Sequence, residues 1–165
     1  MRWKPLLALG AAQFLVVLDT SVMNVSISQL VEDFATDVAA IQAVITVYTL
    51  VMAAFLVTGG KVGDLIGRRR AFVVGLVVYG VGSLLTALAP TLFWLTTGWS
   101  IIEGLGGALV LPALAALVGG NFEGRERAVA YGVIGGLAGA GIAVGRPPAG
   151  RLGDHVPHLA ARVRR

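Results

Sequence analysis

Two carboxyl groups lie within long apolar stretches of the sequence, where an ionised side chain is costly. Asp19 follows the run Leu15–Leu18, and Glu103 follows Ile101 and Ile102. Carboxyl groups inside a membrane usually face a cavity or a partner and often carry protons. Removal from water favours their protonated form, so each could bind and release a proton reversibly. The alternative for both residues is structural, as polar contacts between neighbouring helices.

The composition indicates what kind of elements hold these residues. The chain has 165 residues, of which 56% are hydrophobic and 13% charged, whereas a soluble domain has about 25% charged residues. A membrane helix needs about 20 apolar residues. We therefore predict an all-α, polytopic membrane protein with five transmembrane helices, at about residues 5–31, 39–60, 71–89, 92–118 and 128–144.

These spans place the two carboxyl groups at the same depth. With a rise of about 1.5 Å per residue, Asp19 lies about 16 Å from the outer end of the first span. Glu103 lies about 18 Å from the outer end of the fourth span by the same measure. We expect the two residues to share one level of the bundle.

The charges predict the orientation, because loops on the cytoplasmic side keep Lys and Arg. Up to Gly145 the basic residues fall at the N-terminus and in the second and fourth loops, which predicts a multi-pass protein of the cell membrane with a cytoplasmic N-terminus. Eight basic and eight acidic residues balance over this part, so the net charge of +4 comes from residues 146–165. We expect this tail to be a basic segment outside the membrane.

Glycines are concentrated in the fourth and fifth spans. In the fifth span they include two pairs four residues apart, Gly132 with Gly136 and Gly141 with Gly145. Small residues at this spacing let helix backbones approach closely in lipid. We expect these four glycines to pack helices together.

The residues around Asp19 resemble a known family. The segment Leu18–Ile27, with Asp19 and Asn24, is similar to the first-helix signature L-D-x-T-x-V-N-V-A-L-P of the drug:proton antiporters with fourteen spans in the major facilitator superfamily. Ser21 stands at the position of the family threonine. The resemblance implies that Asp19, Asn24 and Glu103 take part in proton coupling or substrate binding.

The segment between the second and third spans resembles the superfamily loop G-x-L-x-D-R-x-G-R-[KR]. Gly60, Asp64, Gly67, Arg68 and Arg69 match it, and Leu65 replaces the arginine after the aspartate. Glycines permit a tight turn, and an aspartate can pair with an arginine or a helix N-terminus. The resemblance implies a cytoplasmic gate; the alternative is an ordinary basic loop that fixes topology.

Two further motifs match less completely. The run Ser100–Ala108 with Pro112 resembles R-x-x-Q-G-x-G-x-A…P, with Ser100 in place of the arginine and Glu103 in place of the glutamine. Gly132–Gly145 resembles the antiporter signature G-x-x-x-G-P-x-x-G-G, but Arg146 stands where the family has proline. We therefore also interpret the tail as an out-of-frame continuation: with permitted codons, residues 151–165 read one base later give GWVTTYLTWRLAFV, which resembles the family's sixth span.

The resemblance implies an N-terminal portion of a proton-coupled exporter of small apolar or cationic compounds, with five helices of one half. Such a portion is not expected to transport alone, and it could pair with a missing half or with itself. The alternative is a small membrane interaction protein that oligomerises or binds a partner through glycine-rich faces. We expect no enzyme activity, no cofactor, no metal site at His155 and His158, and no nucleic-acid binding.

Overall fold

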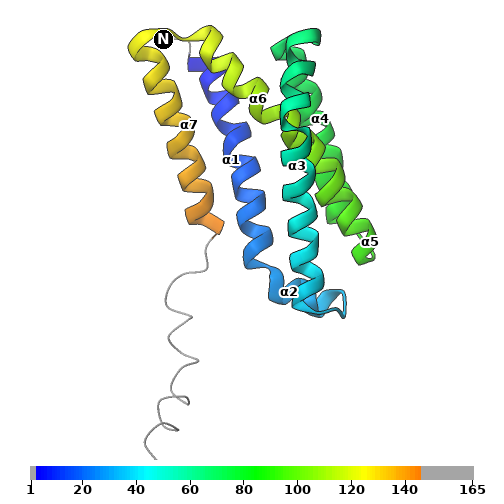
Figure 1. The fold of residues 1–165 in the computed structure, drawn as a ribbon. Helices are drawn as coiled ribbons and strands as arrows, with labels where there is room; N and C mark the ends of the chain where they lie inside the picture. The colour runs from blue at the N-terminus through cyan, green and yellow to red at the C-terminus, as the bar shows by residue number, and fades with distance from the viewer. Residues whose placement is uncertain (1–2, 146–165) are drawn as a thin grey trace, which may run out of the picture.

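The computed structural model describes residues 3–145, and it is helical throughout with short connections (Figure 1). No strand occurs in this range, so the predicted all-α class is confirmed. The helices in chain order are α1 (Trp3–Val25), α2 (Ile27–Asp33), α3 (Val38–Ile66), α4 (Arg68–Ala87), α5 (Leu92–Leu95), the π-helical segment η1 (Thr96–Glu103), α6 (Gly104–Asn121) and α7 (Gly124–Gly145).

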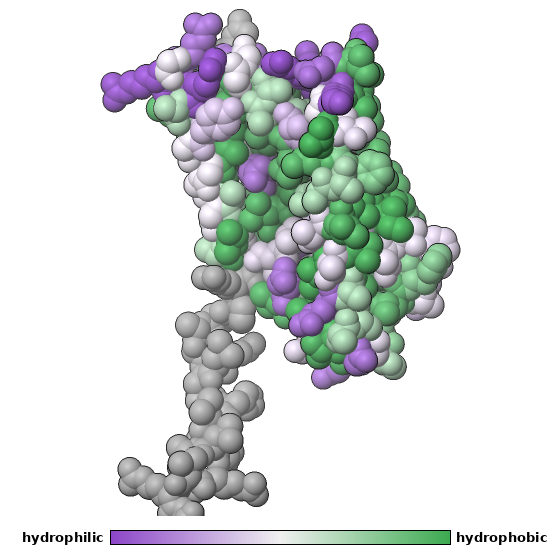
Figure 2. All heavy atoms as spheres, in the orientation of Figure 1, coloured by the Kyte–Doolittle hydropathy of each residue, from purple (hydrophilic) through white to green (hydrophobic). Residues whose placement is uncertain are grey.

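Five of the helical stretches in the described range are long and apolar enough to cross a membrane. They are Pro5–Val25, Val38–Ile66, Arg68–Ala87, Leu92–Asn121 and Gly124–Val144. Figure 2 shows hydrophilic residues gathered at the two ends of the bundle, with a mainly hydrophobic surface between them. This distribution is typical of helices that cross a bilayer.

The helices pack in two groups that share α6. This helix packs against both α3 and α4, while α1 packs against α7 (Figure 1). One buried cluster joins α1, α4, α6 and α7 through residues such as Leu9, Phe72 and Val110. A second cluster lies farther along the bundle. It joins the C-terminal end of α1 and the N-terminal half of α3 to η1 through Met23, Tyr48 and Trp99.

The first predicted span, 5–31, covers two helices in the structure, because α1 stops at Val25 and α2 begins at Ile27. Hydroxyl and amide side chains bond back to their own helix just before the break. Thr20 Oγ1 donates to the Val16 carbonyl at 3.0 Å, and Asn24 Nδ2 donates to the Thr20 carbonyl at 2.8 Å. Bonds of this kind compete with the backbone ladder and favour a bend.

On the side that carries the basic residues, the helices extend beyond the limits of the other predicted spans. The second span was expected to end at Gly60, whereas α3 continues to Ile66, and only Gly67 separates it from α4. Gly67 has a φ of 94°, which favours glycine. The fourth and fifth spans likewise extend to Asn121 and start at Gly124. The helices continue through charged residues after the apolar run has ended. The end of an apolar run therefore does not mark the end of its helix.

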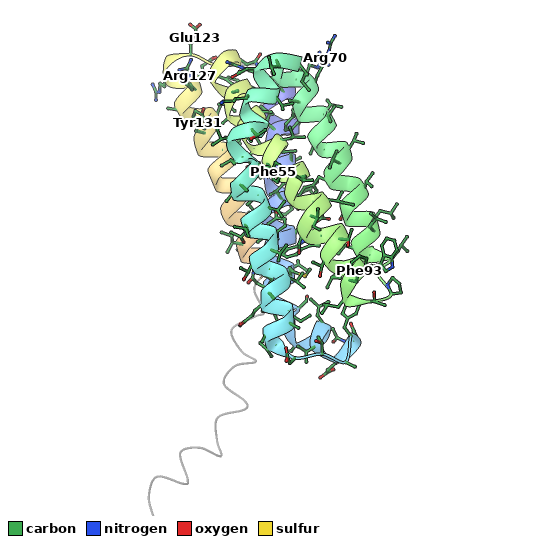
Figure 3. All side chains as sticks on the ribbon, turned by 45° about the vertical axis from the view of Figure 1, so that its right-hand side comes forward. Phe55, Arg70, Phe93, Glu123, Arg127 and Tyr131 are labelled. Atoms are coloured by element: carbon green, nitrogen blue, oxygen red, sulfur yellow. The ribbon has the colours of Figure 1, made fainter. Side chains whose placement is uncertain are left out.

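The end of the bundle with Lys61, Arg68–Arg70, Arg125 and Arg127 is here called the basic end. Arg70, Glu123 and Arg127 lie together at this end in Figure 3, far from Phe93. Arg127 closes the C-terminus of α6: its Nη2 donates to the Gly119 carbonyl at 2.7 Å, and its Nε to the Phe122 carbonyl at 2.9 Å. A cation at a helix C-terminus also interacts favourably with the helix dipole.

Replacing Arg127 with methionine is expected to lower the free energy of unfolding by about 1 kcal/mol, because the last carbonyls of α6 lose charged donors. Thermal unfolding in detergent, followed by circular dichroism, measures the change. Arg125→Met is the matched control, since no comparable bond from Arg125 occurs in the described part of the chain. Equal stability of the two variants would contradict this role.

Candidate functional site

Asp19 lies at the centre of a polar cluster inside the bundle. Its Oδ2 accepts one hydrogen bond from the Tyr79 hydroxyl at 3.0 Å and another from Trp99 Nε1 at 2.7 Å. The three residues come from α1, α4 and η1, so the aspartate joins three separate elements. Both donors are neutral, and the sequence between Lys4 and Lys61, and between Arg70 and Arg125, contains no lysine or arginine.

Glu103 is fully buried at the end of η1, and neither of its carboxyl oxygens has a hydrogen-bond partner. Its side chain fills space that Gly82 of α4 leaves free, since a Cβ at Gly82 would lie 2.6 Å from Glu103 Cγ. The carboxyl group lies close enough to Asp19 for the two to interact electrostatically. The sequence predicted that Asp19 and Glu103 share one depth in the membrane. In the structure the two carboxyl groups lie close together.

Aromatic rings build the wall of this cluster. Tyr48 of α3 stacks on Trp99 with ring centroids 4.4 Å apart and an angle of 15° between the planes. Both rings are buried, and the Tyr48 hydroxyl has no hydrogen-bond partner. Ser100, which stands at the family's arginine position, donates its hydroxyl to the Val44 carbonyl at 2.7 Å. Ser100 therefore fixes η1 to α3.

Two cavities flank the stacked rings. The first, of about 450 Å³, reaches Asp19 and Trp99 and opens toward α2 and Pro90. The second, of about 440 Å³, is lined by α1, α3, α6 and α7 and includes Thr20, Asn24 and Tyr48. We call the second the apolar cavity, because most of its exposed surface is apolar. Its other lining residues are Gln13, Val16, Val17, Ser21, Thr49, Met52, Leu111 and Ile142.

The predicted gate residues lie at the basic end, but most of them are helical. Gly60 and Asp64 belong to the last turns of α3, and Gly67 alone forms the turn. Arg68 Nε lies 3.7 Å from Asp64 Oδ1, and Arg68 Nη1 donates to the Ala116 carbonyl of α6 at 3.2 Å. Arg69 lines a shallow hollow with Ile66 and Val73. The segment therefore contacts α6 as well as forming a turn.

The predicted packing glycines of α7 behave differently from one another. Added Cβ atoms at Gly132 and Gly136 would meet nothing within 4 Å, whereas one at Gly141 would lie 3.1 Å from the Phe14 carbonyl oxygen. Gly145 ends α7. Close approaches to the backbone of a neighbouring helix occur instead at Gly59, where a Cβ would overlap the Ala108 carbonyl oxygen, and at Gly106, where a Cβ would lie 2.6 Å from the Tyr79 nitrogen. Spacing alone therefore did not identify the tightest helix contacts.

Sequence reasoning missed the donors of Asp19. Tyr79 and Trp99 are 60 and 80 residues away along the chain. One available signal was the position of Trp99, four residues before Glu103. No group of three or more metal-ligating side chains lies together in residues 3–145. His155 and His158, where the sequence predicts no metal site, lie outside the described residues.

A bundle of apolar helices around a buried carboxyl cluster and a cavity is the architecture of a membrane transport protein. Residues 9–157 match the family model of the Major Facilitator Superfamily. The chain belongs to the major facilitator superfamily, a family of transporters.

Similar proteins include several connected with drug resistance. The chain is 40% identical over 159 residues to puromycin resistance protein pur8 of Streptomyces alboniger, covering 94% of this chain and 31% of that protein. It is 37% identical to a probable actinorhodin transporter of Streptomyces coelicolor, covering 93% and 26%. It is 35% identical to multidrug resistance protein Stp of Mycobacterium tuberculosis, covering 90% and 28%. The chain thus spans about a third or less of these relatives' lengths.

The family match also bears on the C-terminal tail. It continues to residue 157 in the reading frame of the printed sequence. The out-of-frame interpretation of residues 151–165, which lie outside the described structure, stays a prediction that the nucleotide sequence tests.

Proposed function

We propose that this chain is the N-terminal portion of a proton-coupled exporter of small apolar or cationic compounds in the cell membrane. The observation that carries the proposal is the pair of half-buried Asp19 and fully buried Glu103 beside a cavity, in a family of transporters. The relatives named for resistance to puromycin and to multiple drugs support the export of small compounds. Further membrane helices are needed for transport, since each relative is about three times longer or more.

In this proposal the apolar cavity forms one wall of the compound-binding site. Asn24, Thr20 and Tyr48 are among the polar residues that line it, while most of its exposed surface is apolar, the usual make-up of a small-molecule site. Asp19 and Glu103 exchange the protons that drive export. The coupling follows from the proximity of the proton site to the cavity wall, because Tyr48 lines the cavity and stacks on the ring that binds Asp19.

The basic end faces the cytoplasm in this proposal, with the N-terminus on the same side, because basic residues are retained there. The gate is the segment from Gly60 to Arg69. Arg68 links Asp64 of α3 to the Ala116 carbonyl of α6, so a change in the packing of α3, α4 and α6 alters both contacts together.

A second function is favoured by the open glycine face of α7. Gly132, Gly135, Gly136 and Gly139 all lack neighbours within 4 Å of an added Cβ. Such a face suits close packing with another membrane helix. A small membrane interaction protein would use it to bind a partner or a second copy; in the exporter, the same face would contact the remaining transporter helices.

The test uses a chimaera in which residues 1–145 replace the corresponding part of the Streptomyces alboniger protein. Bacteria that express the chimaera are expected to resist puromycin, and Asp19→Asn is expected to abolish that resistance, because the amide cannot exchange the proton. The 165-residue chain alone is expected to give no resistance. Growth at increasing puromycin concentrations, with protein amounts checked by immunoblot, is the measurement.

Asp37→Asn is the matched control, since it removes the same charge at the exposed N-cap of α3, where the Asp37 side chain accepts a hydrogen bond from Ala40 N. Asparagine caps helices as well as aspartate does, so this variant should retain resistance. Full resistance in Asp19→Asn would refute the proton role. Stable binding to a partner protein without resistance in any form would favour the interaction protein.

A further inference from the structure

Asp19 and Glu103 differ in their burial and in the hydrogen bonds available to them. Asp19 is half-buried, and one of its oxygens receives two donors, at 3.0 Å and 2.7 Å. Glu103 is fully buried, and neither oxygen receives any. Donors stabilise a carboxylate, whereas a buried carboxylate without partners is strongly disfavoured.

Within residues 3–145, no lysine or arginine is among the side chains that interact electrostatically with Glu103. The ionisable groups that face the pair are Tyr48 of α3 and Tyr79 of α4, together with Asp19 of α1 and Glu103 of η1 themselves. Ser83 of α4 adds a neutral polar group near Glu103. Two adjacent carboxyl groups in a poorly solvated site cannot both ionise without a large cost, so one keeps a proton.

We propose that Asp19 and Glu103 hold a single proton between them in this conformation, that the proton resides on Glu103, and that Tyr79 and Trp99 are positioning residues that hold the Asp19 carboxylate through their hydrogen bonds. The inference rests on the proposed function only in treating this pair as the proton site. Trp99 and Glu103 belong to the same π-helical segment. A movement of η1 away from α1 would therefore remove a donor from Asp19 and reposition the protonated partner in one step.

The arrangement of donors offers a matched pair of substitutions. Tyr79→Phe removes a hydroxyl that donates to Asp19, whereas Tyr48→Phe removes a hydroxyl that has no hydrogen-bond partner. Both tyrosines are buried, and both substitutions leave the ring in place. Any effect specific to the bond at Asp19 should therefore appear in the first variant alone.

Infrared spectroscopy of the full chain in lipid nanodiscs tests the inference without any need for transport. The carbonyl stretch of a protonated carboxyl group is expected at neutral pH. This band should shift when glutamate is labelled with ¹³C at its side-chain carboxyl group, and it should not shift when aspartate is labelled in the same way. The band should be absent in Glu103→Gln. The carboxylate stretch of ¹³C-labelled aspartate should shift in Tyr79→Phe, which loses a donor to Asp19, and stay in place in Tyr48→Phe.

A neutral-pH band that follows labelled aspartate, or no such band, would overturn the inference. Equal behaviour of Tyr79→Phe and Tyr48→Phe would overturn the role of Tyr79. The isotope result uses the unsubstituted chain, so it does not depend on how well any variant folds. Puromycin resistance of the chimaera is measured separately, so loss of export with the expected bands would refute the proposed function and leave this inference intact.

Discussion

Gly106→Ala is expected to lower the free energy of unfolding by about 3 kcal/mol, because there is no room for a single methyl group at this position. A Cβ there would lie 2.6 Å from the Tyr79 nitrogen, 2.8 Å from Tyr79 Cα and 3.0 Å from the Gly75 carbonyl oxygen. All three are backbone atoms of α4, so no side-chain rotation can relieve the overlap. The two helices must move apart, and Tyr79 must move with them.

The matched control is Gly136→Ala on α7. An added Cβ at Gly136 meets nothing within 4 Å, and alanine is a better helix former than glycine. This variant should be at least as stable as the unsubstituted chain. Unfolding in increasing sodium dodecyl sulfate, followed by circular dichroism, compares the two. A Gly106→Ala variant as stable as Gly136→Ala would show that α4 and α6 do not pack as described.

Trp99→Ala is expected to cost about 3–5 kcal/mol, as large-to-small changes of buried aromatic residues do. The side chain is fully buried, stacks on Tyr48 and donates to Asp19. Its removal leaves a cavity between α3 and η1 and takes away one of the two donors of the carboxylate. The same unfolding measurement applies.

Two variants separate these contributions. Trp94→Ala, in the short helix α5, removes the same side chain where it is 47% exposed, and it should cost less than about 1 kcal/mol. Trp99→Phe keeps a ring against Tyr48 but removes the indole N–H, so its cost should be intermediate. A loss in Trp94→Ala as large as that in Trp99→Ala would contradict the central position of Trp99.

The spans and the sidedness of the charges could be predicted from the sequence, because hydropathy and loop charges are local properties. Helix ends could not, since α3 continues through Lys61 and Asp64 after the apolar run has ended. The break at Ser26 depends on local bonds such as that of Asn24 to Thr20. The π-helical form of η1 had no recognisable signal in the sequence.

The composition of the site was predictable only in part. Asp19 and Glu103 are conspicuous because a charge in an apolar run is rare. Tyr79 and Trp99 are not conspicuous, because an aromatic residue in a membrane helix can face lipid, a neighbouring helix or a buried acid equally well. Their role depends on how α1, α4 and η1 cross, which no single segment reveals.

The bond between the Trp99 indole and Asp19 also gives the molecule an internal optical probe. Indole emission depends on nearby charge, and the indole nitrogen lies 2.7 Å from the Asp19 carboxylate. The chain has three tryptophans, so replacing Trp3 and Trp94 with phenylalanine leaves Trp99 as the sole emitter. Changes around the Asp19 carboxylate can then be followed in real time, with no dye attached to the protein.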